Sequence, residues 1–269
     1  MLIKKIKKIG WSFLRKKYVF LKSYSLFLYN HSDIKPYNEA KLHSYKNKYY
    51  GKKAFIICNG PSLTTTDLER IESEGYMSFA ANRISAIFPD TSWRPTYYTV
   101  TDSAQFWLNP TINQVECAFL PKTSYCNTLK TIASKVYFDI EDNRDLLKNP
   151  KFSPDCDRVI YSIGTVTYTL FQIAVYMGFR ELYLIGCDNR YHREIKADGS
   201  IIIHNEVPNK YAGKDTETNE AANTWEMNVA YDAAKKYADE HGIKILNATR
   251  GGYMEIFDRV DFDSLFEDK

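Results

Sequence analysis

Short apolar runs alternate with amphipathic stretches along most of the chain from residue 54 onward. The apolar runs end in polar or glycine-containing turns and comprise Ala54–Cys58, Met77–Ala81, Tyr97–Val100, Ala118–Leu120, Lys135–Phe138, Leu182–Ile185 and Ile243–Leu246. Runs of this kind are typical of strands buried on both faces. The intervening stretches predict helices over Asp67–Ser73, Val166–Met177 and roughly Glu220–His241. The alternation predicts an α/β fold with a Rossmann-like, mostly parallel sheet flanked by helices.

The turn after the first predicted strand is the clearest candidate for a binding site. Asn59, Gly60, Pro61 and Ser62 follow the apolar run, and residues 66–69 have the pattern of a capping box that begins a helix. Open α/β sheets bind nucleotides at such a place, between a buried strand and a helix N-terminus. The turn is neither a G-x-G-x-x-G nor a Walker A sequence, so it does not indicate hydride transfer or P-loop hydrolysis. An ordinary strand–turn–helix connection is the alternative.

Two later strand ends offer polar groups to the same edge of the sheet. Residues 164–177 predict a helix that is buried on most of its circumference, and the strand that follows it ends at Asp188. Asp188 is suited to bind a metal, a ribose or a substrate hydroxyl, or to cap a turn. If the strands are parallel, Asn247 after the last strand lies at the same edge as Asn59, which favours a nucleotide site there.

Residues 189–218 lack periodicity and predict a lid-like excursion from the domain. The excursion holds the densest group of side chains suited to proton transfer and phosphate binding, namely Tyr191, His192, Arg193, His204, Tyr211 and Lys214. Histidines that simply occupy a surface loop are the alternative interpretation.

Charge is distributed unevenly along the chain. The net charge of +3 combines 14 Lys/Arg and two acids in residues 1–53 with an acidic remainder. We therefore divide the chain into a basic amphipathic N-terminal arm, 1–50, and a Rossmann-like domain, 51–269. The arm mixes lysines with aromatic residues, which predicts contact of residues 1–30 with an anionic inner leaflet, at about 1 kcal/mol per basic residue. Packing on a partner chain is the other interpretation, whereas the acidic body argues against nucleic acid.

Two further features of the sequence indicate where in the cell the protein is located. The longest charge-free stretch of the arm, residues 23–32, is about half of a bilayer span, and the arm lacks the features of a secretory signal. The five cysteines form no C-x-x-C pair and are odd in number, which favours reduced thiols over a disulfide framework or a structural zinc site. We expect a cytoplasmic protein, peripheral at the inner face of the cell membrane.

Five segments resemble a known family, namely FIICNGPSL (55–63), ANRI (81–84), RPTYYTVTD (94–102), GTVTYTLFQIAVYMGFRELYLIGCD (164–188) and ILNATRGG (245–252). They look like the MptE-like (6-hydroxymethylpterin diphosphokinase-like) proteins of bacterial polysaccharide gene clusters. More remotely, they are similar to Campylobacter-type sialyltransferases, which use a CMP-linked sugar. The resemblance covers nearly everything after residue 50.

The sialyltransferase resemblance implies roles for particular residues. The positions that bind the donor nucleotide correspond to Asn59, Gly60, Ser62, Asn82, Gly164 and Thr165. The position that contacts the donor sugar corresponds to Asp102, where the sialyltransferases carry Asn. Their catalytic histidine precedes the long C-terminal helix, and the matching position here is close to Trp225. The catalytic base therefore does not carry over.

The residues themselves suggest substitutes for that base. An inverting transfer needs a base near the acceptor hydroxyl and a clamp for the leaving phosphate. His204, ranked first, and Glu226 are candidate bases, and Tyr191 with Arg190 or Lys214 would stabilise the phosphate. We assign no metal site, but Asp102 and Asp188 would hold Mg²⁺ across a diphosphate if the donor is UDP-linked.

We therefore expect a glycosyltransferase that moves a sugar from a CMP- or UDP-linked donor to a hydroxyl of a surface polysaccharide or lipid-linked glycan. The first alternative is a Mg²⁺-dependent diphosphokinase that transfers pyrophosphate from ATP to a pterin-like alcohol. The second is a non-catalytic nucleotide-sugar-binding subunit recruited to the membrane. Relatives of this kind often assemble, so a homo-oligomer is a further expectation.

Overall fold

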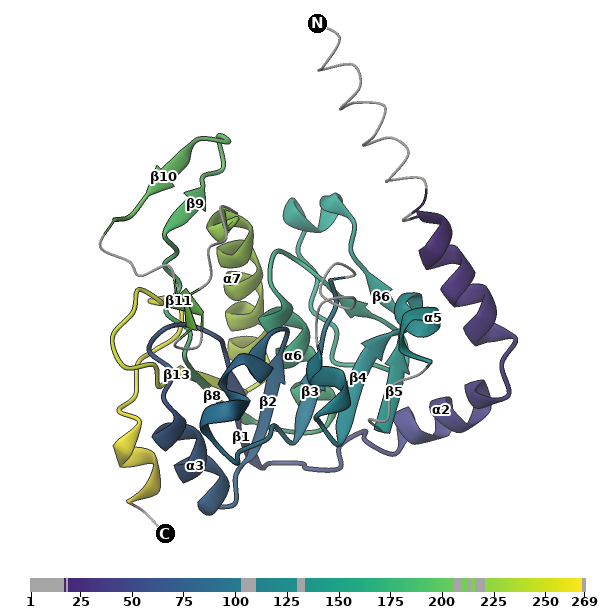
Figure 1. The fold of residues 1–269 in the computed structure, drawn as a ribbon, viewed down its shortest axis with the longest axis horizontal. Helices are drawn as coiled ribbons and strands as arrows, with labels where there is room; N and C mark the ends of the chain where they lie inside the picture. Colours follow the sequence, from purple (N-terminus) through teal and green to yellow (C-terminus); the bar gives the residue numbers. More distant parts are fainter. Residues whose placement is uncertain are drawn as a thin grey trace, which may run out of the picture.

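A seven-stranded sheet forms the centre of the protein, in the order β13-β8-β1-β2-β3-β4-β5 with every neighbouring pair parallel (Figure 1). The computed structural model describes residues 17, 19–102, 110–129, 134–205, 210–211, 214–215 and 221–267. The strands of the sheet are β1 (Lys53–Ile57), β2 (Met77–Ala81), β3 (Tyr97–Thr99), β4 (Cys117–Pro121), β5 (Ser134–Phe138), β8 (Glu181–Ile185) and β13 (Lys244–Asn247). The predicted α/β fold is confirmed, and each predicted strand lies within one residue of the observed one.

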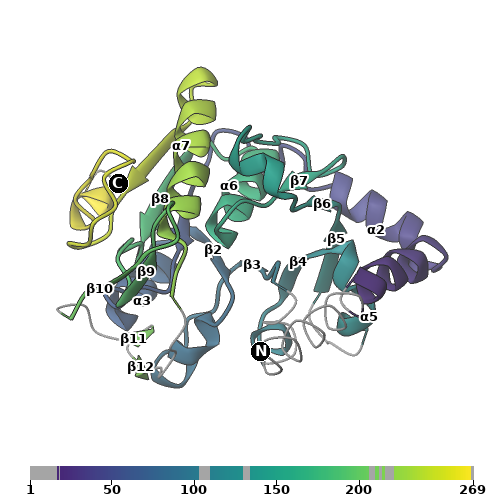
Figure 2. The same cartoon turned by 90° about the horizontal axis from the view of Figure 1, so that it is seen from above.

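Helices cover both faces of the sheet (Figure 2). Besides the helix of residues 19–30, the α-helices are α2 (Ile34–His43), α3 (Thr65–Ser73), α5 (Tyr125–Thr128), α6 (Val166–Tyr176) and α7 (Thr224–Glu240). The 3₁₀ helices are η1 (Ile84–Asp90), η2 (Pro110–Asn113), η3 (Lys122–Ser124), η4 (Arg144–Leu147) and η5 (Asp263–Phe266). In β1, Ala54 and Ile56 pack in the cluster with α6 and α7, whereas Phe55 and Ile57 pack with α3 and η1. Both faces of the central strands are therefore buried, which explains their continuous apolar sequences.

The chain reverses direction across the sheet beside β1. From β1 it proceeds through β2, β3, β4 and β5 towards one edge, and then it returns to β8 on the other side of β1. In open parallel sheets, ligands bind outside the carboxyl ends of the strands at such a reversal of strand order. The topology thus predicts the position of a ligand site before any side chain is considered.

Two of the predicted helix starts need correction. The N-cap of α3 is Thr64, whose side chain accepts a hydrogen bond from the Asp67 amide, so the helix begins earlier than the expected capping box at 66–69. The helix α7 begins at Thr224 rather than near Glu220. The prediction that α6 is buried is confirmed, because residues 167–176 are all buried.

The excursion has more regular structure than its sequence indicates. It contains the antiparallel pairs β9 (Arg193–Ile195) with β10 (Ile201–Ile203) and β11 (Lys210–Tyr211) with β12 (Lys214–Asp215). Backbone hydrogen bonds between residues 193–195 and Ala222 attach the first pair to the segment before α7. A short parallel pair, β6 (Ile140–Glu141) with β7 (Ile160–Tyr161), lies beyond the edge of the main sheet.

The segment before β1 packs against the body of the protein. Residues 19–30 are helical, and α2 follows them. Asn38 of α2 is buried, and its side-chain amide both donates to and accepts from the backbone of Tyr137 in β5. Within the described ranges, no helix is both long and apolar enough to cross a membrane.

Candidate functional site

A cavity of about 610 Å³ lies at the carboxyl ends of the central strands. The loops after β1, β2, β3 and β8 contribute to its wall, together with the first turn of α6 and one side of α7. Its position coincides with the reversal of strand order between β1 and β8, where open parallel sheets bind ligands. The volume is within the range of small-molecule sites.

The turn after β1 and the turn after β8 are locked together. The Gly60 amide donates to the carbonyl of Gly186 over 2.8 Å. A Cβ atom built on Gly60 would lie 1.8 Å from Asp188 Oδ2 and 2.5 Å from that carbonyl, so the close approach requires glycine. Ser62 completes the contact, because its hydroxyl donates to Asp188 Oδ2 over 2.8 Å.

Asp188 therefore fixes the conformation of the turns that form the candidate nucleotide site. Its carboxylate accepts from the hydroxyl and the amide of Ser62, and its carbonyl accepts from the Tyr253 amide in the turn after β13. Burial raises the pKa of Asp188 above the ordinary aspartate value, although the hydrogen bonds from Ser62 oppose this rise. Asp188 lines the cavity as expected, but these contacts make it a positioning residue for the turns.

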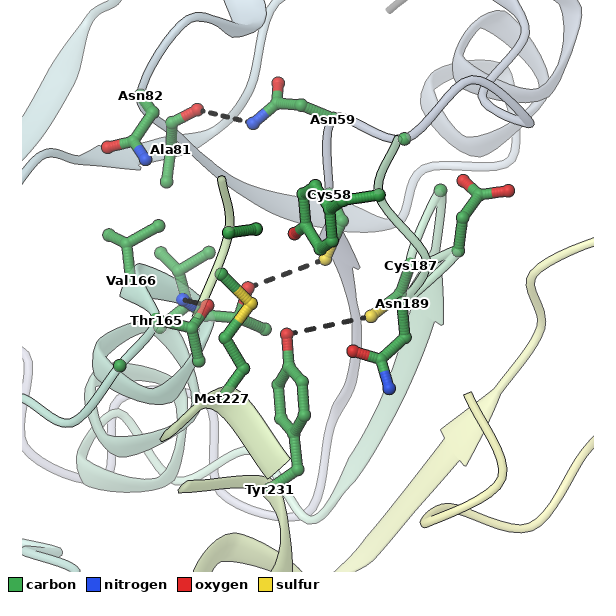
Figure 3. Close-up of a pocket in the computed structure, with 18 of the residues that line it drawn as sticks. Cys58, Asn59, Ala81, Asn82, Thr165, Val166, Cys187, Asn189, Met227 and Tyr231 are labelled. Atoms are coloured by element: carbon green, nitrogen blue, oxygen red, sulfur yellow. Dashed lines mark hydrogen bonds between the residues drawn. The ribbon is translucent and has the colours of Figure 1, made fainter. Parts of the chain in front are cut away.

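Two asparagine amides lie near each other in the cavity wall (Figure 3). Asn59 Nδ2 donates to the carbonyl of Ala81 over 3.1 Å, while Asn59 Oδ1 is a buried acceptor that has no hydrogen-bond partner within the described residues. Asn82 has a φ of 54°, in the left-handed region, and its carbonyl accepts from the Tyr98 hydroxyl. A buried acceptor without a partner and a strained backbone are both typical of ligand-binding positions.

The N-terminus of α6 faces the same cavity. Thr165 is its N-cap and accepts from the Thr167 amide, and Gly164 precedes it with a φ of 56°. A Cβ atom on Gly164 would lie 2.5 Å from the carbonyl carbon of Glu226, so the glycine lets α7 approach α6. The first amides and the dipole of an eleven-residue helix form a favourable environment for a phosphate group.

Sulfur and aromatic groups lie next to these polar groups (Figure 3). Cys187 Sγ is 3.9 Å from the Tyr231 hydroxyl, and Cys58 Sγ is 3.6 Å from Thr167 Oγ1. Contact with the Cys58 thiol, together with burial, raises the pKa of Cys187 well above its usual value. Met227 of α7 also lines the cavity. The Cys187 thiol therefore stays protonated and serves as packing rather than as a nucleophile.

The excursion contributes five consecutive residues to the wall, namely Asn189, Arg190, Tyr191, His192 and Arg193. The Arg190 guanidinium lies 3.7 Å from the centre of the Tyr253 ring and 3.9 Å from Glu194 Oε1. Glu194 also accepts from the Tyr191 amide and the Thr224 hydroxyl, so it joins the excursion to the start of α7. Arg190 is thus held in place before any ligand arrives.

Among the described residues, the two histidines of the excursion have different positions. His192 lines the cavity, whereas His204 does not. The Nδ1 atom of His204 lies 3.4 Å from Nη1 of Arg190. His192 Nδ1 lies 3.1 Å from the carbonyl of His204. A carbonyl only accepts, so Nδ1 carries the proton, and the unshared pair of a neutral His192 ring is on Nε2.

The remaining candidates divide between the cavity and its surroundings. Asp102 is exposed and lines the cavity after β3, as expected. Glu226 lies outside the cavity lining, since its carboxylate is 3.2 Å from Arg144 Nη2. Asn247 is buried with its amide bonded to Met254 and Thr249, so it orders its own turn instead of lining the cavity. The side chain of Lys214 lies outside the described residues.

These positions revise the expectations from sequence. Asn59, Asn82 and the start of α6 come together at one cavity, whereas Glu226, Asn247 and His204 do not line it. Ser62 acts through Asp188 and is not part of the lining. Within the described part of the chain, no group of three or more His, Cys, Asp or Glu side chains is arranged to hold a metal ion.

Comparison with models of known protein families found a match over more than half of the chain. A sequence model described as "6-hydroxymethylpterin diphosphokinase MptE-like" matches residues 26–194, which is more than half of the chain. The chain belongs to the MptE-like family. This match spans the turns after β1, β2, β3 and β8 and the helix α6, and so includes most of the cavity of this MptE-like protein.

A solved structure shares the fold. The MAf glycosyltransferase from Magnetospirillum magneticum AMB-1 matches 84% of this chain with a TM-score of 0.50 and 19% identity. The match spans 38% of the Magnetospirillum chain, and at this identity it establishes similarity of fold alone. Comparison with curated proteins found no match.

Proposed function

We propose that this protein is a glycosyltransferase that moves a sugar from a CMP- or UDP-linked donor to a hydroxyl of a surface polysaccharide or lipid-linked glycan. The observation that carries the proposal is the meeting of Asn59, Asn82 and the N-terminus of α6 at one cavity. The amides are suited to a base and ribose, and the helix N-terminus to the phosphate. The match to the Magnetospirillum glycosyltransferase fold is consistent with this assignment.

The side chains around the cavity suit an inverting transfer. The acceptor oxygen attacks the anomeric carbon of the donor sugar, the bond from that carbon to the phosphate oxygen breaks, and the nucleotide leaves with the bonding electrons. Arg190, with Tyr191 beside it, would stabilise the charge that develops on the phosphate. His192 Nε2 would take the proton of the acceptor hydroxyl, a role that its position favours over His204.

The role of a metal ion depends on the donor. Asp102 and Asp188 both line the cavity and would hold Mg²⁺ across a diphosphate, although the Asp188 carboxylate also accepts two hydrogen bonds from Ser62. A metal bound to Asp102 would neutralise part of the charge on a diphosphate leaving group.

A diphosphokinase is the alternative that the family description supports. Such an enzyme would bind ATP in the same cavity and transfer pyrophosphate to an alcohol. It would have no need of the basic arm, whereas a glycosyltransferase with a lipid-linked acceptor would use the arm at the inner face of the cell membrane.

Nucleotide-dependent thermal stabilisation tests the proposal. We expect CMP or UDP to raise the melting temperature, because a ligand that binds only the folded state stabilises it, and we expect Asn59→Ala to abolish that rise. Asn247→Ala is the matched control: it should lower the melting temperature of the free protein while leaving the nucleotide-induced rise intact. A rise with ATP and Mg²⁺ alone would favour the diphosphokinase, and donor binding without turnover would favour a non-catalytic subunit.

A further inference from the structure

The helix formed by residues 19–30 has two distinct faces. Its inner face is fixed to the body, where Ser25 Oγ donates to Cys126 Sγ and the fully buried Tyr29 accepts from Asn38 Nδ2. On the opposite face, Phe20, Tyr24 and Phe27 are 65%, 45% and 56% exposed. The three lie at i, i+4 and i+7, so they form one continuous aromatic stripe along the helix.

The charge of this region restricts what the aromatic stripe can contact. Residues 1–30 contain eight Lys/Arg and no acid. A second copy of the chain would bring two strongly basic segments together, which opposes self-association through this face. An anionic lipid surface matches both properties, since aromatic side chains enter the headgroup region while lysines stay with the lipid phosphates.

The same helix touches the rim of the cavity. Lys22 Nζ lies 2.5 Å from Oδ2 of Asp142, a half-exposed residue that lines the cavity directly after β6. Figure 1 shows the helix, in purple, beside α5 and β5 at the edge of the sheet. Contact of the helix with a surface would therefore bring the cavity mouth close to that surface.

We propose that helix 19–30 rests on an anionic lipid bilayer through Phe20, Tyr24 and Phe27, and that the Lys22–Asp142 ion pair holds the cavity mouth beside the bilayer. The use of this arrangement rests on the proposed function: a lipid-linked acceptor would reach the cavity without leaving the membrane. The surface contact itself does not depend on the reaction.

Vesicle sedimentation of the full-length protein tests the surface. We expect binding to phosphatidylcholine vesicles that contain phosphatidylglycerol, little binding to phosphatidylcholine alone, and a loss of at least about tenfold in the triple variant Phe20→Ser, Tyr24→Ser, Phe27→Ser. Tyr50→Ser is the control, because Tyr50 is an aromatic residue that is 71% exposed but lies in the turn before β1. Unchanged vesicle binding of the triple variant, or equal binding to both vesicle types, would overturn the proposal. A protein dimer that is disrupted by the triple variant but not by Tyr50→Ser would also overturn it, because the stripe would then contact a second copy of the chain.

Two further measurements separate the surface from the cavity. Hydrogen exchange with and without anionic vesicles should show slower exchange in peptides that cover residues 19–31 and 140–147; protection confined to 19–31 would overturn the placement of the cavity. Thermal stabilisation of the triple variant by CMP or UDP should equal that of the wild type. If neither nucleotide stabilises either protein while vesicle binding behaves as expected, the proposed function fails and the lipid contact stands.

Discussion

At the scale of single residues, His192 and His204 offer a direct test of the proposed base. We expect His192→Ala to lower turnover by about 10²- to 10⁴-fold, the usual contribution of a general base. His204→Ala is the matched control, since it keeps the backbone carbonyl that accepts from His192 Nδ1 and should cost much less. Steady-state release of nucleotide from the donor measures both. A larger loss in His204→Ala would restore the ranking that the sequence suggested.

Asp188 gives a prediction about pH. Burial raises its pKa and Ser62 lowers it, so Ser62→Ala should raise the pKa of Asp188 further. Because the pKa in the folded protein is above that of the unfolded chain, the protonated form favours folding, and this contribution is lost as pH rises through the folded-state pKa. Carboxyl-carbon NMR titration would detect the shift. Asp198 is an exposed control, hydrogen bonded to Ser200, whose titration should not move. An unchanged pKa of Asp188 would contradict the proposed effect of the Ser62 hydrogen bonds.

At the scale of secondary structure elements, the N-terminus of α6 links stability to ligand binding. Thr165→Ala removes the N-cap and should cost about 1 kcal/mol of unfolding free energy. It should also weaken nucleotide binding, because the first amides of the helix lose their fixed direction. Thr165→Ser keeps the capping hydroxyl and should preserve both properties. Urea unfolding and calorimetric titration with CMP or UDP measure them, and nucleotide affinity unchanged in Thr165→Ala would remove α6 from the phosphate site.

The elements that the sequence predicts well are those defined by local pattern. The strands of the sheet and the helix α6 are buried on nearly all sides, so their apolar runs alone reveal them. The hairpin of β9 and β10 escapes such reasoning, because β9 also forms backbone hydrogen bonds with Ala222, which is distant along the chain. The same limit applies to the site. The location of Asn59 at the site can be predicted from its place after a strand. The position of Glu226 outside the cavity depends on its contact with Arg144, which is distant in the sequence.

Asp188 shows most clearly what can and cannot be predicted about a site residue from the sequence. Its position after a buried strand predicts a polar group at the crevice, and the structure places it there. Its function as a clamp for the turn after β1 depends on how closely Gly60 approaches it, which only the packing of β1 against β8 determines. A sequence therefore indicates which residues reach an edge of a sheet, but not which of them remain available to a ligand.

At the scale of the whole molecule, the basic arm and the folded body overlap. Tyr29 is fully buried, packs on Tyr125 and Tyr137, and its hydroxyl accepts from Asn38. Compared with a protein that lacks residues 1–18, a protein that lacks residues 1–33 should therefore have an unfolding free energy lower by about 3–5 kcal/mol, the usual cost of removing a large buried aromatic side chain. Urea unfolding of the two truncated proteins measures the difference. Tyr29→Phe keeps the ring and loses only the hydrogen bond, so it should cost about 1 kcal/mol. Equal stability of the two truncated proteins would mean that helix 19–30 does not pack stably on the body. A membrane surface that contacts this helix would then not be held at a fixed position relative to the cavity rim.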